Sequence, residues 1–347
     1  GSQQSYFLVG GSTCGILAGI YAAVEKGGRI LMSRNCHRSV YNAVELVGAS
    51  PVYLSPQWDP IWGIEGPVSP ENVKKAIAEN SDISLVVITS PTYDGIISDI
   101  AEIANVVHAA GLPLMVDEAH GAHLDLSPYF TGGAVKAGAD FVVQSLHKTM
   151  PSLTQTAIAH VCSDRIDSRR FSVALSIFET SSPSYLLMAS IDECINYMDA
   201  KMFKMWNDAI VENKNIFSSL AKLHVLGYSE AVPPSSWNRD PSKILVNTRF
   251  CDLTGPYLGE ILRKQYHIEV ELAAAQYILA MTGPGDTVNT IGAFAAALRE
   301  IDHMCVSCTP QSCLPAPLPQ RICGVYAAKR GRRTVVNRRR AVGKISG

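Results

Sequence analysis

The sequence predicts an α/β fold with a mostly parallel sheet in a large domain, followed by a small α+β C-terminal domain. Between residues 6 and 161, short apolar runs alternate with helical patterns, which is typical of a parallel sheet with helices on both faces. Apolar residues make up 47% of the 347 residues and charged residues only 18%, as suits a buried sheet. We expect domains over 1–200 and 201–303, and a Pro/Cys-rich, basic tail over 304–347.

Each predicted strand is a short apolar run that ends in polar or turn-forming residues. In the large domain these runs cover 6–9, 29–33, 51–54, 84–88, 112–116, 141–143 and 157–161. Helical patterns follow over 14–24, 38–47, 70–79 and 98–109, a loop covers 55–70, and one long helix over 184–221 bridges the domains. In the small domain we expect strands at 243–248, 268–272 and 277–282, with helices at 257–266 and 286–302.

Composition excludes several classes of protein. The net charge of −1 gives no global field for nucleic acid or for a membrane surface, so we expect neither partner. No apolar run approaches the roughly 18 residues of a membrane span. The nine scattered cysteines indicate reduced thiols. We therefore expect a cytoplasmic protein, or an organellar one, such as a plastid protein, if a transit peptide is missing.

Lys148 lies between two apolar runs, Phe141–Val143 and Ala157–Val161, directly after Ser145 and His147. A buried unpaired ammonium is costly, so a lysine is unusual in this place. Its pKa falls at the mouth of a sheet, and the neutral amine can attack a carbonyl. This stretch therefore suggests Schiff-base chemistry.

Two further turns follow strands. Gly10-Gly11-Ser12-Thr13 combines a helix N-terminus with two hydroxyls, which can bind a phosphate, although plain helix capping by Ser12 or Thr13 is the alternative. His37 stands where a strand passes into a helix. It is either a capping or surface residue, or an aromatic plate stacked on a cofactor ring.

Asp117 follows an apolar strand directly, so its carboxylate is desolvated unless a cation pairs with it. It can hold a pyridinium N–H, and the small Ala119 lets a flat ring lie close. A helix-capping role is the alternative. Together with His120 and His123 it also offers metal-ligand types, but a metal site needs a shaped set of three or four ligands, and we expect no metal.

The tail also admits a metal interpretation, because Cys305, Cys308 and Cys313 lie near His303, but their spacing is poor for zinc. Eight basic residues and no acidic ones occur from Lys329 to Lys344. Such a segment is a nucleic-acid arm, a targeting signal or part of an incomplete domain. We favour the incomplete domain.

Five motifs occur in the order of one known family: Leu8–Thr13, Arg34–Ser39, Ser90–Gly95, Asp117–His123 and Ser145–Thr149, the last continued by Leu153–Thr156. They resemble the bacterial-type ornithine/lysine/arginine decarboxylases. The resemblance covers about residues 5 to 302. It implies the aspartate-aminotransferase fold (fold type I), pyridoxal 5′-phosphate (PLP) as cofactor, and decarboxylation of a basic amino acid in amine and polyamine metabolism.

The resemblance also implies a role for each candidate residue. Lys148 would bind PLP as a Schiff base, Asp117 would keep the pyridine nitrogen protonated, and His37 and Ala119 would contact the two ring faces. Four residues would hold the phosphate: Ser12, Thr13, Ser145 and His147. Thr180 and Ser182 match a segment near the partner subunit's site, so a homodimer or a larger assembly of dimers is implied. Glu179 is our candidate for the acidic group that a basic substrate needs.

The chain departs from the family pattern at three places. Gly10 stands where the family usually has Asn, the family's N-terminal segment does not precede the first motif, and Val342–Ser346 resembles the start of a C-terminal domain. The alternatives are another PLP enzyme of this fold, such as an aminotransferase, lyase or aldolase, or a truncated paralogue without turnover. Substrate choice among lysine, ornithine and arginine does not follow from the motifs.

Overall fold

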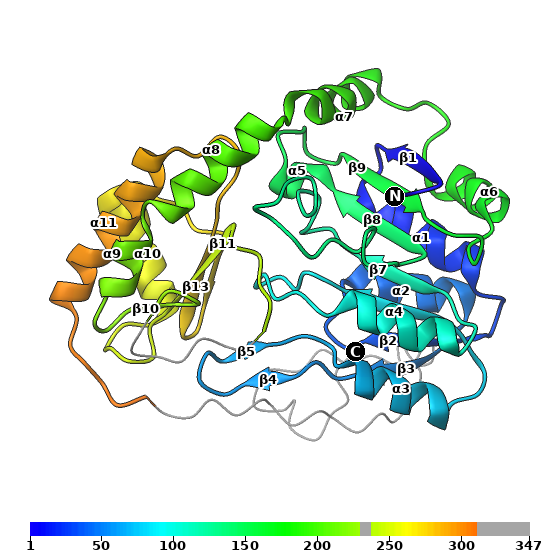
Figure 1. The fold of residues 1–347 in the computed structure, drawn as a ribbon, viewed down its shortest axis with the longest axis horizontal. Coiled ribbons are helices and arrows are strands. Elements are labelled where there is room, and N and C mark those ends of the chain that lie inside the picture. The colour runs from blue at the N-terminus through cyan, green and yellow to red at the C-terminus, as the bar shows by residue number, and fades with distance from the viewer. Residues whose placement is uncertain (230–236, 311–347) are drawn as a thin grey trace, which may run out of the picture.

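A seven-stranded sheet forms the centre of the first part of the chain (Figure 1). The computed structural model describes residues 1–229 and 237–310. The strands, in spatial order, are β1 (Gln4–Leu8), β9 (Ala157–Val161), β8 (Phe141–Ser145), β7 (Leu114–Asp117), β6 (Ile83–Thr89), β2 (Arg29–Ser33) and β3 (Ser50–Leu54). Neighbours from β3 to β8 are parallel, and β9 runs antiparallel to both β8 and β1. The predicted α/β fold with a mostly parallel sheet is confirmed.

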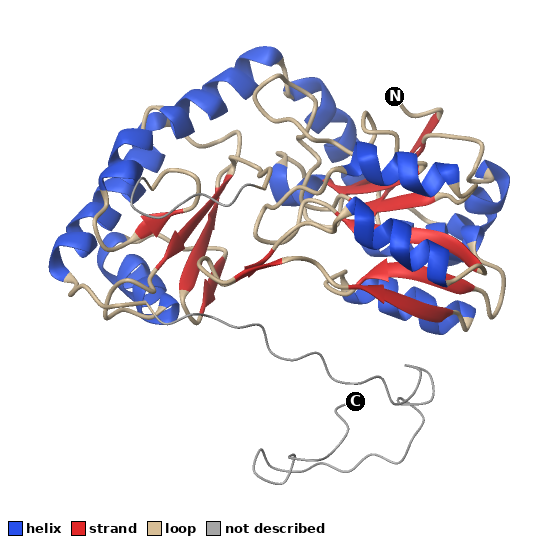
Figure 2. Ribbon diagram, turned by 60° about the horizontal axis from the view of Figure 1, so that its bottom comes forward, coloured by secondary structure: helices blue, strands red, loops and turns tan. Residues whose placement is uncertain are grey.

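Helices cover both faces of this sheet (Figure 2). One face packs against α1 (Gly11–Ala23), α2 (Arg38–Val47) and α6 (Ser168–Phe178), and the other against α3 (Pro70–Glu79) and α4 (Ile100–Ala109). Successive strand residues point to opposite faces, so Val86 joins one core and Val87 the other. Both faces are therefore apolar, which explains the continuous apolar runs in the sequence.

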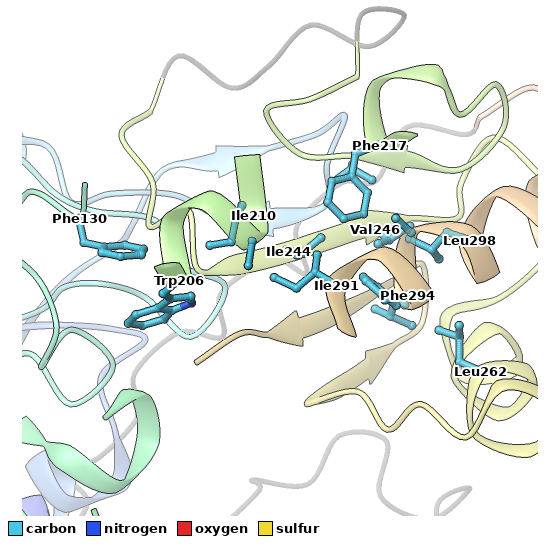
Figure 3. Packing of buried hydrophobic residues seen from close by; sticks show 14 of the residues in the cluster. Phe130, Trp206, Ile210, Phe217, Ile244, Val246, Leu262, Ile291, Phe294 and Leu298 are labelled. Carbon is cyan, nitrogen blue, oxygen red and sulfur yellow. The ribbon is translucent and has the colours of Figure 1, made fainter. Parts of the chain in front are cut away.

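The second sheet is antiparallel and smaller. Its strands, in spatial order, are β10 (His224–Val225), β11 (Lys243–Asn247), β13 (Tyr277–Met281) and β12 (Leu272–Ala274). Three helices pack their apolar side chains against it, namely α8 (Ala200–Val211), α10 (Gly255–Tyr266) and α11 (Val288–Met304), with α9 (Lys214–Ser219) beside them. Figure 3 shows Phe217, Phe294 and Leu298 in this core.

Three sequence predictions need correction. The single long helix over 184–221 is wrong, because the chain forms α7 (Tyr185–Tyr197), α8 and α9 instead. The helical pattern is interrupted at Asp199, because its side chain accepts a hydrogen bond from the Met202 N–H and so caps the start of α8. The strand over 268–272 begins only at Leu272, because His267 at φ 57° and the Ile268 N–H close the end of α10. The loop over 55–70 contains a small hairpin of β4 (Trp58–Asp59) and β5 (Ile64–Glu65).

The two sheets are joined by aromatic packing and a buried hydrogen-bonded pair of side chains. Trp206 on α8 lies with its ring centroid 4.4 Å from that of Phe130, in the loop that follows β7 (Figure 3). His123 Nε2 lies 3.1 Å from Asp240 Oδ1, and both side chains are completely buried. The second sheet is thus docked onto the loop after β7. Across residues 1–229 and 237–310, no helix combines the length and apolarity that crossing a membrane requires.

Candidate active site

The candidate site residues gather where the parallel strands end. Strand β7 ends at Asp117 and its neighbour β8 at Ser145, after which the short helix α5 (Leu146–Thr149) carries His147 and Lys148. His37 follows β2 on the same sheet edge. Since ligands of open α/β sheets bind beyond the carboxyl ends of the strands, this edge is the expected position for a site.

Asp117 is 2% exposed, and its Oδ1 accepts a hydrogen bond of 3.2 Å from the Ala119 N–H. Burial raises the pKa of this carboxyl, while the Ala119 N–H, Lys148 and His37 oppose the rise. Within the part of the chain that the structure describes, no side chain is hydrogen-bonded to this carboxylate. Asp117 is therefore a buried acid whose ionised form a cationic hydrogen-bond donor would stabilise, and it is not a helix cap, because no helix begins at it.

Lys148 has an amine suited to nucleophilic chemistry. Its Nζ lies 3.1 Å from His120 Nε2. Burial lowers the pKa of the amine, and the charges of Asp117 and Glu271 only partly oppose this. The neutral form of Lys148 is consequently favoured relative to that of a surface lysine.

His37 is the N-cap of α2, as the capping interpretation predicts. Its Nδ1 accepts a 3.3 Å hydrogen bond from the Ser39 N–H and lies 2.8 Å from Ser39 Oγ. Burial lowers the pKa of the ring, and charge interactions with Asp117 and Lys148 place it at the same site. A neutral ring in this position also suits contact with an aromatic cofactor, so the cap and the stacking role are compatible.

The Gly-rich turn leads into α1, and here the simpler interpretation is wrong. The N-cap is Gly10, without a side-chain cap, so neither Ser12 nor Thr13 caps the helix. Instead Glu179 Oε2 accepts hydrogen bonds from the Gly10 N–H at 3.3 Å and from Cys14 Sγ at 3.0 Å. A Cβ atom on Gly10 would lie 3.0 Å from Glu179 Oε1, so a side chain larger than glycine requires Glu179 to move.

The other candidate phosphate ligands lie around the turn between α5 and β9. Ser145 is completely buried, and its Oγ has no hydrogen-bond partner among the described residues. His147 Nδ1 donates to the Thr156 carbonyl at 2.9 Å. A Cβ atom on Gly11 would lie 3.9 Å from the Gln155 carbonyl oxygen, so the turn before α1 borders this segment.

Sequence reasoning missed Lys243, which reaches this site from β11 of the second sheet. It is 3% exposed, and its Nζ donates to the Tyr93 carbonyl at 2.9 Å and lies 3.0 Å from His120 Nδ1. Burial lowers the pKa of Lys243 to about 8. The sequence does contain a signal for Lys243, because this lysine is the first residue of an apolar strand, just as Lys148 follows the end of one. Tyr93 in turn donates through its hydroxyl to Glu271 Oε1 at 2.6 Å.

The remaining sequence candidates lie only partly in this cluster. Thr180 and Ser182 lie in the exposed loop between α6 and α7, where the Ser182 N–H donates to Thr180 Oγ1. His120 contacts two lysines, and over residues 1–229 and 237–310 no three His, Cys, Asp or Glu side chains group as metal ligands. Cys313 and the basic segment from Lys329 to Lys344 lie outside the described residues.

Comparisons with known proteins agree with this geometry. Residues 1–221 match the family model for the major domain of Orn/Lys/Arg decarboxylases. An arginine decarboxylase of Bacillus cereus is 31% identical over 309 residues, covering 87% of this chain and 66% of the relative. An uncharacterized Bacillus subtilis protein, YaaO, is 39% identical over 289 residues, covering 80% of this chain and 58% of its own length.

Among solved structures, a Francisella novicida lysine decarboxylase superimposes with a TM-score of 0.73 at 19% identity, covering 87% of this chain and 49% of the other. The fold is that of PLP-dependent fold type I enzymes. The chain spans two thirds or less of the length of these relatives. With more than half of its residues matched by the family model, the chain belongs to the Orn/Lys/Arg decarboxylase family.

Proposed function

We propose that this chain carries the active site for PLP-dependent decarboxylation of lysine, ornithine or arginine to the corresponding amine and CO₂. The observation that carries the proposal is the pairing of a pKa-lowered amine, Lys148, with the buried acid Asp117 at one sheet edge. A carbonyl cofactor with a protonated ring nitrogen requires both groups.

The residues present fit PLP. Asp117 lacks a side-chain hydrogen-bond donor among the described residues, which suits the N–H of a pyridinium. The buried Ser145 Oγ is an unpartnered donor that suits a phosphate oxygen. Ser12, Thr13 and His147 would complete the phosphate site, and His37 and Ala119 would contact the ring.

Each residue contributes a separate physical effect. Bound PLP supplies an electron sink for the electron pair released when the carbon–carboxylate bond breaks. Asp117 holds a proton at the ring nitrogen, so the positive charge remains where the electrons move. Lys148 provides a neutral amine as nucleophile, and neutral His37 adds no competing charge beside the ring. Burial of this edge excludes water and strengthens these charge interactions.

A basic substrate carries a second cation, which acidic groups attract. Glu271 and Asp94 are suited to this role because their charges act on Lys148 and Lys243 at the site. The Tyr93 hydroxyl holds Glu271, and the Tyr277 hydroxyl donates to Asp94 Oδ1 at 2.9 Å. Glu179, the candidate from sequence, binds the Gly10 turn instead. We therefore assign the attraction of the distal cation to Glu271 and Asp94.

A homodimer is part of the proposal. Tyr185 and Leu186, at the start of α7, are 83% and 71% exposed, and Val173 and Ile177 on α6 are also exposed. Neighbouring exposed apolar side chains mark interaction surfaces. Thr180 and Ser182 lie in the loop between these two helices, where a second copy would bring them toward the partner's site.

The proposal is tested by adding PLP to the purified chain, reducing with borohydride and locating the adduct by mass spectrometry. We expect the pyridoxyl group on Lys148, and we expect CO₂ release from at least one of lysine, ornithine and arginine. Lys148→Ala should abolish both, whereas Lys136→Ala, on an exposed turn, should leave both unchanged. An adduct spread over surface lysines would refute the assignment. An adduct on Lys148 without CO₂ release would indicate a chain that binds PLP without turnover.

A further inference from the structure

His120 lies between two lysines that come from different sheets. Its Nε2 is 3.1 Å from Nζ of Lys148, which follows β8 in the large sheet. Its Nδ1 is 3.0 Å from Nζ of Lys243, on β11 of the small sheet. The Tyr93 ring packs edge-on against the imidazole, with the ring centroids 5.0 Å apart. The imidazole is therefore held in place as a bridge between two amines.

The two contacts restrict how many protons the cluster holds. Burial, followed by the charges of Lys243 and Lys148, lowers the pKa of His120 to about 2, so the ring is neutral at neutral pH. A neutral imidazole has one N–H donor and one acceptor nitrogen. One ring nitrogen therefore accepts from a lysine N–H, while the other must donate to an amine that has lost its proton. Both contacts are satisfied only when at least one of the two lysines is neutral.

The surroundings indicate which lysine keeps its proton. The Lys243 ammonium has a second acceptor, the Tyr93 carbonyl at 2.9 Å, and lies 5.4 Å from the centroid of the Tyr93 ring. Carboxylates favour the charged form of both lysines, namely Asp240, Asp94 and Glu271 for Lys243 and Asp117 and Glu271 for Lys148, so the hydrogen-bond partners decide between them. Among the described residues, Lys148 has His120 as its hydrogen-bond partner and no other acceptor. The neutral amine thus fits Lys148, and the ammonium fits Lys243.

We propose that Lys243 is a positioning residue that acts through His120: it carries the proton that Lys148 would otherwise hold, and so keeps the Lys148 amine neutral. This inference rests on the proposed role of Lys148 as the reacting amine. The same contacts return a proton when Lys148 needs one. Lys243 Nζ gives a proton to His120 Nδ1 while the His120 Nε2 proton passes to Lys148 Nζ. The ring is neutral before and after, and one positive charge moves from Lys243 to Lys148.

Other ionisable groups face this cluster and enter its pH dependence. Asp117 and Glu271 favour the charged form of Lys148, while His37 and His147 act on His120. The groups that face Lys243 are Asp240, Asp94 and Glu271. Among the described residues, none of their side chains is hydrogen-bonded to Nζ of Lys148 or of Lys243, so the imidazole is the direct connection.

The test measures the reactivity of individual lysines in the cofactor-free chain. Trace acetic anhydride is applied between pH 6 and 11, and mass spectrometry gives the labelling midpoint of Lys148 relative to exposed lysines such as Lys75. In the unaltered chain we expect Lys148 to titrate well below the exposed lysines. If the labelling midpoint of Lys148 equals that of the exposed lysines, the proposal is overturned by the unaltered chain alone.

Lys243→Met keeps the apolar stem and removes the ammonium. We expect the Lys148 midpoint to rise by about one pH unit, which lowers its labelling rate near pH 7.5 by about tenfold. Lys264→Met, an exposed change in the same domain, should have no effect. Lys222 reports on folding, because its ammonium binds the carbonyls of Asp302 and Cys305, and it should remain slow to react.

A double-mutant cycle separates the bridge from a simple charge effect. In a His120→Phe background, which lacks both ring nitrogens, Lys243→Met should change Lys148 labelling by less than about twofold. An equal effect in both backgrounds overturns the proposal, and so does an effect below twofold in the unaltered chain. Since no cofactor is added, this outcome is independent of whether PLP reacts with Lys148, so the two proposals fail separately.

Discussion

Asp117→Asn should affect the cofactor-free and the PLP-bound chain in opposite directions. Asparagine has nearly the same shape but lacks the charge. Burial raises the pKa of the Asp117 carboxyl above its usual value of 3.8, so ionisation inside the folded chain is unfavourable. A group with a raised folded pKa contributes less stability as pH rises through that pKa. The variant should therefore unfold at an equal or higher temperature than the unaltered chain at pH 7 to 8, without PLP.

The magnitudes follow from the contacts of this carboxylate. Each unit of raised pKa corresponds to about 1.4 kcal/mol that the variant recovers above the pKa. When PLP is present, the variant loses a charge-assisted hydrogen bond in a buried site, about 1.5–3 kcal/mol. That range corresponds to a weakening of PLP binding of about 10- to 150-fold.

Thermal unfolding with and without PLP measures both effects, and titration of the cofactor's visible absorbance gives the affinity. Asp125→Asn is a matched control, because Asp125 also lies in the loop after β7 but binds the Gly132 and Gly133 N–H groups. If Asp117→Asn changes PLP affinity by less than about threefold, Asp117 is not the partner of the ring nitrogen. The inference drawn from its lack of a side-chain hydrogen-bond donor would then be refuted.

Three other changes test separate features. Glu179→Gln weakens the hydrogen bond from the Gly10 N–H and removes a negative charge from the turn proposed to bind the PLP phosphate, so PLP titration should show several-fold tighter binding. An unchanged affinity would mean that the phosphate does not bind at this turn. Asp302→Ala leaves the backbone N–H groups of Ala221, Lys222 and Leu223 without their acceptor. Denaturant unfolding should show that the free energy of unfolding falls by roughly 3 kcal/mol, and a fall below about 1 kcal/mol would contradict these contacts. Burial raises the pKa of Glu118 from 4.5 to about 8, so the folded chain loses stability as the pH rises between these values. The melting temperature of Glu118→Gln should therefore rise relative to that of the unaltered chain over this interval. A difference in melting temperature that stays constant with pH would refute the shift.

The sheet and the edge that holds the candidate site could be predicted from the sequence because strand ends are local features. Asp117 and Ser145 end apolar runs, and the structure places both at the ends of neighbouring parallel strands. Lys148 was recognisable for a related reason, since a lysine after an apolar run needs a specific environment. Short-range patterns thus predicted the central part of the candidate site.

What could not be predicted depends on contacts between distant segments. Lys243 meets His120 from a position 123 residues later, and Glu179 meets Gly10 from 169 residues later. The apolar spacing does not predict the helix break at Asp199, because the spacing continues through this residue. The break depends on one side-chain hydrogen bond, from the Met202 N–H to Asp199, which competes with continuation of the helix. Hydrophobic periodicity alone does not resolve such competition.

The position of Lys243 connects the chemistry of Lys148 to the docking of the two sheets. His120 belongs to the loop after β7, and three residues later His123 contacts Trp206 and Asp240 at the junction of the sheets. Asp240 in turn is three residues before Lys243, and its carboxylate favours the Lys243 ammonium. A change in docking that separates Asp240 from His123 would also move Lys243 relative to His120. Because the His120 contact needs a ring nitrogen and an amine within about 3 Å, a displacement of 1 Å is enough to break it. The neutral state of the Lys148 amine is therefore a property of the docked pair of sheets, and neither sheet provides it alone.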